Sequence, residues 1–228
     1  MHYDVYLQVG RDLRTHAHVP ALPGCNWLAA DPQSAMEMAL NRISDHLNWL
    51  RRHGLPASSL AEPIVPHLKQ EKKSRAADGH MVGFFDCDLQ PIEAEETKSL
   101  LAILSCSRQD LLALTRELEQ QTLHHFPAPG EWSIAQILRH VASAERWYLT
   151  RILDPSTLPK LKPSRSIWQR LESVRALAID RLQNLTAEQR SALIIRDGEQ
   201  WTARKVFRRF LEHEREHYHH ILQVLSSL

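Results

Sequence analysis

Residues 207–221 of this 228-residue chain read FRRFLEHEREHYHHI, a pattern that indicates an amphipathic helix in the second half of the chain. Phe210 and Ile221 lie on the apolar face of a helix with the usual helical period. His213 and His217 stand in the gap of that apolar stripe, where core residues are expected. Side chains four residues apart on a helix have Cβ atoms roughly 5–6 Å apart, so the two imidazoles can share one metal ion. The segment therefore predicts a core-facing helix that carries two metal ligands.

Three further amphipathic segments precede this one in the chain. The four predicted helices span residues 93–119, 133–153, 166–185 and 203–225. Four apolar stripes of this length are typical of an all-α four-helix bundle, which we assign to residues 92–228. Between the second and third helices, residues 154–165 contain three prolines and are predicted to be extended. Twelve extended residues reach about 40 Å and a twenty-residue helix is about 30 Å long, so this connection allows parallel neighbours.

The second predicted helix opens with a capping box formed by Ser133 and Gln136, and Trp132 and Ile137 are placed as a hydrophobic staple. His140 lies on the inner, apolar face of this helix. If the second and last helices run antiparallel, His140 lies about 10 Å and the other two histidines about 15 Å from the same end of the bundle. The sequence therefore allows one metal site that two helices supply.

Residues 213–217 also match the HExxH motif of zinc proteases. Two observations weigh against a protease. The chain ends eleven residues after His217, and the extended motif fails because Gln223 stands where a histidine is required. We therefore expect the third ligand upstream, at His140. His220, one turn beyond His217, is expected to be either an outer partner of the site or a fourth ligand.

The first part of the chain, residues 1–91, mixes short strand and helix signals and predicts a small α+β domain. Asp31, followed by a proline, marks a helix start, and Gly54 marks the end of that helix. His16 and His18 fall on the same side of a strand, and we expect both to be exposed. The predicted strands span residues 3–9, 16–19, 64–69 and 81–85.

The composition of the chain argues against several classes of protein. The net charge of +1 argues against a protein that coats DNA, so no nucleic-acid partner is expected. Three scattered cysteines exclude a disulfide framework, and no run of eighteen apolar residues suggests a membrane span. The N-terminus lacks the basic-then-apolar layout of a signal peptide, so we expect a cytoplasmic protein. The unusual feature is the number of histidines, fourteen, because histidine is the commonest metal ligand.

Several landmarks follow one another in a recognisable order between residues 97 and 228. They are Gly130-Glu131-Trp132-Ser133, His140-Val141, Glu145, Trp201-Thr202, and His213, Glu214 and His217 before Ile221. As a set they resemble the DinB/YfiT-like superfamily. The resemblance implies an up-down-down-up four-helix bundle that binds a divalent metal, commonly Zn²⁺ or Ni²⁺, through three histidines, here His140, His213 and His217. It also implies relatives that are thiol-dependent S-transferases or isomerases, hydrolases, or proteins without a known activity. His220 departs from the glutamine that relatives often carry.

The first domain is similar to the HicB-like antitoxin fold. The similarity rests on Tyr3 to Val9, His16 to Val19, Leu22 to Cys25 and the helix after Asp31. HicB antitoxins normally carry a small DNA-binding module, and nothing in this sequence resembles one. The domain is therefore expected to serve as a lid, an oligomerisation unit or a surface for a partner, which leaves a homodimer open.

The leading hypothesis is a metal-dependent enzyme, a thiol-dependent S-transferase or a hydrolase, that acts on a small molecule. An S-transferase would use a low-molecular-weight thiol as cosubstrate, and Glu214, beside His213, is a candidate base or outer partner. The alternative is a non-enzymatic regulatory protein whose HicB-like domain binds a protein or RNA partner and whose bundle is a scaffold. A third hypothesis is a bundle that a metal stabilises without any chemistry. We expect no membrane partner under any of these hypotheses.

Overall fold

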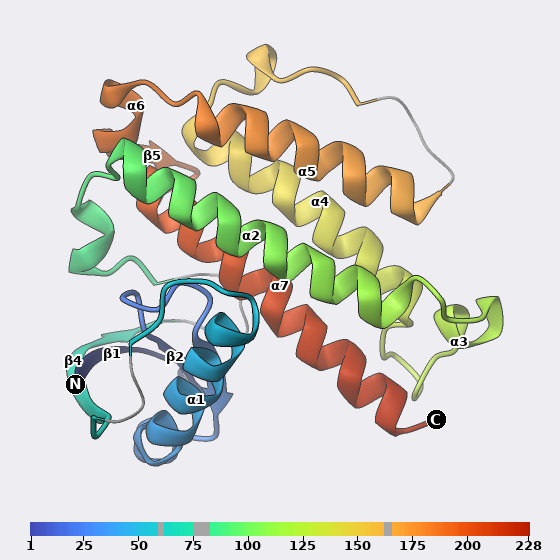
Figure 1. Ribbon diagram of the computed structural model, residues 1–228, viewed down its shortest axis with the longest axis horizontal. Helices are drawn as coiled ribbons and strands as arrows, with labels where there is room; N and C mark the ends of the chain where they lie inside the picture. Colours follow the sequence, from blue (N-terminus) through green and yellow to red (C-terminus); the bar gives the residue numbers. More distant parts are fainter. Residues whose placement is uncertain (59–61, 75–82, 162–165) are drawn as a thin grey trace. The chain divides into compact units, whose positions relative to one another are not determined.

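The computed structural model describes residues 1–58, 62–74, 83–161 and 166–228. Internal contacts divide the chain into two compact units, Met1–Gln90 and Pro91–Leu228. A β-sheet region with one long helix forms the first unit, and the second unit is helical, as the sequence predicts (Figure 1). No helix within these described residues is both long and apolar enough to span a bilayer.

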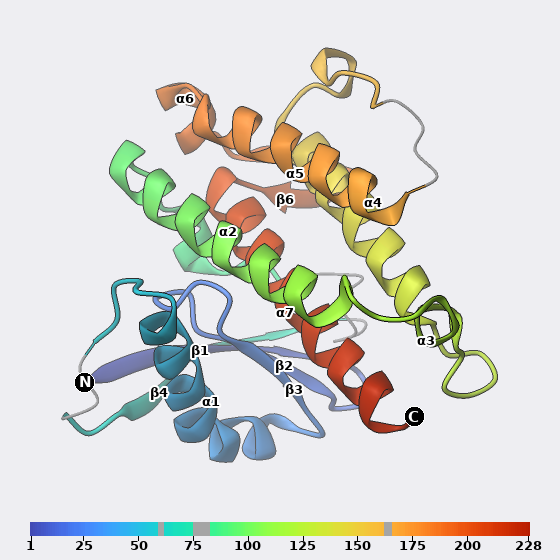
Figure 2. The same cartoon turned by 45° about the vertical axis from the view of Figure 1, so that its right-hand side comes forward.

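The first unit is built on a four-stranded sheet in the order β3-β2-β1-β4 (Figure 2). Its strands are β1 (His2–Val9), β2 (Thr15–His18), β3 (Asn26–Ala29) and β4 (Val65–Lys73). The pairs β1–β2 and β2–β3 are antiparallel, whereas β1 and β4 are parallel. Helix α1 (Pro32–Arg52) contacts all four strands through its apolar face, which buries Ala35, Ala39, Ile43 and Leu47.

Local capping fixes both ends of α1. The Asp31 side chain accepts a hydrogen bond from the backbone nitrogen of Ser34 at 2.8 Å, which satisfies one of the free donors of the first turn. Gly54 follows the last turn with a φ of +65°, a left-handed conformation that glycine adopts without steric cost. Both signals stand in the sequence, which is why this helix could be placed from the sequence.

His16 and His18 are buried, so the expectation that both are exposed is wrong. Asn26 Nδ2 lies 2.8 Å from His16 Nε2. The Phe85 ring packs on His18 with the ring centroids 5.3 Å apart. Polar and aromatic partners thus cover the face of the sheet that carries the two histidines. The pattern of the strand alone does not reveal these partners.

The strand predicted at residues 81–85 is not formed over its described part. Residues 83–85 carry no strand and lead into a short 3₁₀-helix, η1 (Asp86–Leu89), while residues 81 and 82 lie outside the described part of the chain. The Phe85 side chain is fully buried. The apolar residues that resemble a strand therefore belong to a loop, which the buried Phe85 side chain anchors in the core.

The second unit is built from four long helices whose ends lie within a few residues of those predicted. They are α2 (Ala94–Thr115), α4 (Ile134–Ile152), α5 (Ile167–Gln183) and α7 (Ala203–Ser226). Both α2 and α4 contact α5 and α7, so the four helices form a closed ring (Figure 1). The short elements between them are α3 (Gln120–His124), η2 (Pro155–Thr157), α6 (Ala187–Ser191) and the hairpin of β5 (Ile194–Arg196) with β6 (Glu199–Trp201).

Side-chain pairs show how the helices run. His140 of α4 meets His213 of α7, and Tyr148 further along α4 meets Arg209, which lies earlier in α7. These two helices are therefore antiparallel. In Figure 1, α4 and α5 run in the same direction. The bundle core between the four helices contains fully or almost fully buried apolar side chains, among them Leu111, Leu138, Val141, Leu171 and Ile221.

Candidate metal centre

The start of α4 is fixed by the predicted capping box. The Ser133 hydroxyl accepts a hydrogen bond from the backbone nitrogen of Gln136 at 3.3 Å. In return, the Gln136 side-chain oxygen accepts one from the backbone nitrogen of Ser133 at 3.0 Å. This reciprocal cap sets where the helix begins, and it thereby sets the face on which His140 emerges two turns later.

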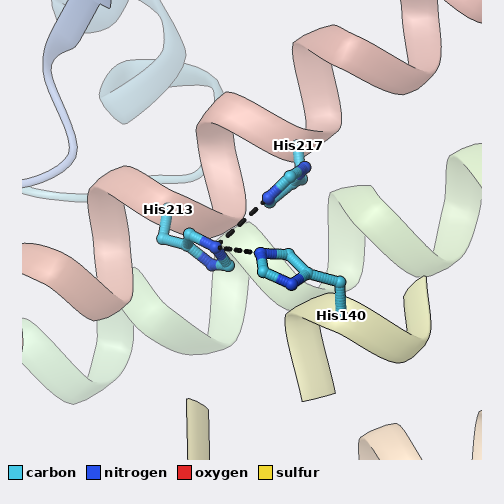
Figure 3. A group of neighbouring side chains, drawn as sticks. All are labelled: His140, His213 and His217. Carbon is cyan, nitrogen blue, oxygen red and sulfur yellow. Dashed lines mark hydrogen bonds between the residues drawn. The ribbon is translucent and has the colours of Figure 1, made fainter. Parts of the chain in front are cut away.

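Three histidines converge between α4 and α7, and Figure 3 shows them pointing toward one another. His140 Nε2 lies 2.9 Å from His213 Nε2, and His217 Nε2 lies 3.2 Å from His213 Nε2. All three rings offer a nitrogen within 4.8 Å of the others. His213 is buried, whereas His140 and His217 are half-buried, so the cluster has a closed side and a more open side.

Hydrogen bonds alone do not explain this convergence. A single imidazole nitrogen has one in-plane position, which holds either a proton or a lone pair. His213 Nε2 therefore cannot form good hydrogen bonds with both of its neighbours. Imidazole nitrogens about 2.0–2.1 Å from a shared zinc ion lie about 3.0–3.4 Å from each other. The observed separations of 2.9 Å and 3.2 Å from His213 Nε2 are close to those of ligands that surround one cation.

The electrostatics of the site favour neutral imidazoles. Burial lowers the pKa of His213 well below its ordinary value, and the neighbouring His217 lowers it further. Burial is also the main reason why the pKa of His217 falls to about 3, with His140 adding to the effect. Both rings are therefore uncharged at neutral pH, which is the form that binds metals.

Trp132 lies beside the cluster rather than only against the apolar core. Its ring centroid is 4.8 Å from that of His140 and 6.3 Å from that of His217, and the second pair is nearly parallel at 17°. The side chain keeps 40% of its surface exposed. The indole therefore forms a wall at the more open side of the histidine cluster, a role that the staple prediction does not include.

Glu214, the candidate base, is engaged elsewhere. Its Oε2 accepts hydrogen bonds from Arg108 Nε at 2.7 Å and from Arg175 Nη2 at 2.9 Å. Burial on its own would raise the pKa of this carboxyl, but the two guanidinium groups outweigh burial and hold the pKa below its ordinary value. A carboxylate that two arginines hold ionised is a weak proton acceptor. The surroundings of Glu214 therefore favour a structural role for this residue over a role as a base.

His220 lies at the edge of the site. Its ring centroid is 6.0 Å from that of His217, and burial lowers its pKa. Within the described residues, the group of converging metal-ligand atoms contains His140, His213 and His217 but not His220. The geometry is that of an outer neighbour, and its part in metal binding stays a prediction.

The family that matches this chain by sequence matches its helical half, which carries the three histidines. The sequence model of the DinB superfamily matches residues 103–221, which include all three histidines. Among solved structures the chain is similar to YfiT from Bacillus subtilis, described as "a probable metal-dependent hydrolase with an unusual four-helix bundle topology". That similarity has 16% sequence identity and a TM-score of 0.46, and it covers 60% of this chain and 90% of the other. A comparison with curated proteins gives no match.

Proposed function

Since the chain belongs to the DinB superfamily, we propose that its helical unit binds one divalent metal ion through His140, His213 and His217 and acts as a metal-dependent enzyme on a small molecule. The observation that carries the proposal is the convergence of three imidazoles, one nitrogen of each lying within 4.8 Å of the others. The cytoplasmic location, the HicB-like nature of residues 1–91 and a homodimer stay predictions.

The donor set favours a borderline transition metal, and within that group the resemblance to the DinB/YfiT-like superfamily implies Zn²⁺ or Ni²⁺. Imidazole nitrogen suits borderline metals such as zinc, nickel, copper and iron, whereas magnesium and calcium prefer oxygen. Structural zinc sites usually have four protein ligands, and catalytic sites usually have three with an open position. Three histidines with no fourth converging ligand among the described residues therefore support a catalytic rather than a structural centre.

The family resemblance implies two reaction classes, and a three-histidine metal site could serve either. A bound divalent metal supplies a Lewis acid that activates water or a small thiol at neutral pH. The first case is a hydrolase, and the second is an S-transferase with a low-molecular-weight thiol as cosubstrate. In both cases His213 holds the metal from the buried side, and Trp132 borders the side from which a substrate approaches. The proposal gives Glu214 a structural part, because its carboxylate is bound by two arginines.

Activity assays with and without metal test this proposal. Chelator-treated protein would be offered a chromogenic ester, and separately a chloronitrobenzene electrophile together with cysteine. We expect no activity without metal, recovery in one of the two assays with Zn²⁺ or Ni²⁺, and none in a His140→Ala variant. His219→Ala is the matched control, because this exposed histidine lies on α7 outside the cluster. Activity that survives chelation contradicts the proposal, and a metal-loaded protein inactive in both assays favours a bundle without chemistry.

A further inference from the structure

Four charged side chains, one from each long helix, meet inside the bundle. They are Arg108 of α2, Glu145 of α4, Arg175 of α5 and Glu214 of α7, and we call them the buried quartet. No member exposes more than 6% of its surface. Two positive and two negative charges make the quartet neutral as a whole, which is the condition under which charges are tolerated in an interior.

Each carboxylate of the quartet is bound by both arginines. Glu145 accepts hydrogen bonds from Arg108 Nη2 at 2.6 Å and from Arg175 Nε at 2.5 Å. Glu214 Oε2 accepts from Arg108 Nε at 2.7 Å and from Arg175 Nη2 at 2.9 Å. The two arginines therefore connect α4 to α7, the helices that carry the three histidines.

The two arginines also join their own helices, α2 and α5, by hydrogen bonds to the backbone. Arg108 Nη1 donates to the backbone oxygen of Leu171 at 2.8 Å, and Arg175 Nη1 donates to the backbone oxygen of Leu104 at 2.5 Å. Each carbonyl lies four residues before the other arginine, so the two bonds are reciprocal. A shift of α2 along α5 would break both bonds, because hydrogen bonds weaken steeply outside their preferred distance and angle.

A gain in the free energy of folding does not explain why the chain buries such a cluster. Removing charges from water costs free energy that ion pairing often fails to recover, and apolar replacements of buried ion pairs are frequently as stable as the original. What the quartet does supply is a fixed spacing between four helices. A slip of one residue along a helix moves a side chain by about 1.5 Å, a large part of the roughly 2 Å between zinc and an imidazole nitrogen.

The quartet lies next to the histidine cluster. Glu145 is five residues beyond His140, and Glu214 directly follows His213. A cavity of about 10 Å³, close to the space of one water molecule, is lined by Glu145, Arg175 and Glu214 and also by His213. The quartet and the most buried of the three histidines therefore border the same small space.

We propose that Arg108 and Arg175 are positioning residues for the metal centre. By holding Glu145 and Glu214 together, they set the distance and orientation at which α4 presents His140 to the two histidines of α7. This inference rests on the proposed metal binding. It predicts that the quartet determines metal affinity more than it determines the stability of the fold.

A charge-free quartet tests the inference. The variant Arg108→Met, Glu145→Met, Arg175→Met and Glu214→Met removes all four charges together, so no buried charge is left unpaired. Thermal unfolding of the metal-free protein and titration with Zn²⁺ or Ni²⁺ by calorimetry are measured side by side. We expect the melting temperature to stay equal or rise and metal affinity to fall by about 10- to 100-fold. Wild-type affinity in this variant overturns the positioning role.

Two further variants sharpen the test. The control Arg204→Met with Glu96→Gln removes another α2–α7 ion pair, with contacts of 2.5 and 2.8 Å, and should leave metal affinity unchanged. If the quadruple variant does not fold, Arg175→Lys decides, because lysine keeps the charge but lacks the guanidinium fork. A folded Arg175→Lys protein with weakened metal affinity supports the inference, and unchanged affinity overturns it. A wild-type protein that binds neither metal refutes the proposed function itself, so the two failures are distinguishable.

Discussion

At the scale of single residues, the site depends on His213. Its Nε2 lies between those of His140 and His217, and it is the most deeply buried of the three rings. Burial keeps this imidazole neutral, and the neighbouring imidazole of His217 acts in the same direction. A residue whose proton is already lost at neutral pH can bind a metal without first releasing one.

The number of ligands is testable residue by residue. His140→Ala should abolish binding of Zn²⁺ or Ni²⁺ at micromolar protein, because it removes one of three converging nitrogens. His220→Ala should retain the metal, because its ring lies outside that group. Calorimetric titration of both variants measures the difference. Equal loss of binding in the two variants would show that His220 is a fourth ligand.

Trp132 should control how readily the metal leaves. Trp132→Ala removes the ring that packs on His140 and His217, so transfer of the metal to a coloured chelator should become faster. The free energy of unfolding of the metal-free protein should fall by only about 1–2 kcal/mol, because two ring contacts are lost at a partly exposed position. Trp147→Ala is the matched control, with 43% exposure against 40% for Trp132. Equal transfer rates in the two variants would contradict the role of Trp132 as a wall.

At the scale of helices and strands, local signals determine what the sequence can predict. The four long helices, the cap at Ser133 and the histidine interruption in the stripe of α7 all depend on residues within a few turns of one another. They could be predicted for that reason. The sequence does not predict the paired strand β3 (Asn26–Ala29), because Trp27, Leu28 and Ala29 are consecutive apolar residues and lack the alternation of a half-buried strand.

The buried quartet could not be predicted in this way. Arg108 lies 37 residues from Glu145 and 106 residues from Glu214, so no local pattern joins them. One signal does exist in the sequence, since Arg108 stands between Leu104 and Leu111, two apolar residues of the buried face of α2. A charge in an apolar stripe indicates a buried partner, but only the packed bundle shows which partner it is. The same limit applies to Trp132, whose contact with His217 joins the segment before α4 to α7.

The cap of α4 has a measurable contribution to stability. Ser133→Ala removes the hydroxyl that accepts from the backbone of Gln136, so the free energy of unfolding should fall by about 1 kcal/mol. Ser173→Ala is the control, because this exposed hydroxyl donates to the backbone oxygen of Gln169 inside α5 and caps no helix end. Urea unfolding of both variants, followed by circular dichroism, gives the two values. A cap variant as stable as the control would contradict the assigned helix start.

At the scale of the whole molecule, the chain combines a sheet unit with a helical unit, and the histidine cluster belongs entirely to the helical one. Because the metal is proposed to join α4 to α7, its binding energy adds to the folding energy of the helical unit. At a metal concentration one hundred times the dissociation constant, the added stability is about 2.7 kcal/mol.

Thermal unfolding measures this linkage. Zn²⁺ or Ni²⁺ should raise the melting temperature of the wild-type protein, and the rise should grow with metal concentration. His217→Ala should melt at the same temperature with and without metal, because one of the converging nitrogens is gone. A metal-dependent rise in that variant, or no rise in the wild type, would contradict the linkage of metal binding to folding.

The most direct test of the metal centre is the metal content of the purified protein. The protein is prepared under reducing, chelator-free conditions, and zinc and nickel are measured per chain by elemental mass spectrometry. His213→Ala is compared with His219→Ala, an exposed neighbour on the same helix. We expect one metal ion per chain in the wild type and in His219→Ala, and almost none in His213→Ala. No metal above background in the wild type, or full occupancy in His213→Ala, would contradict the three-histidine centre.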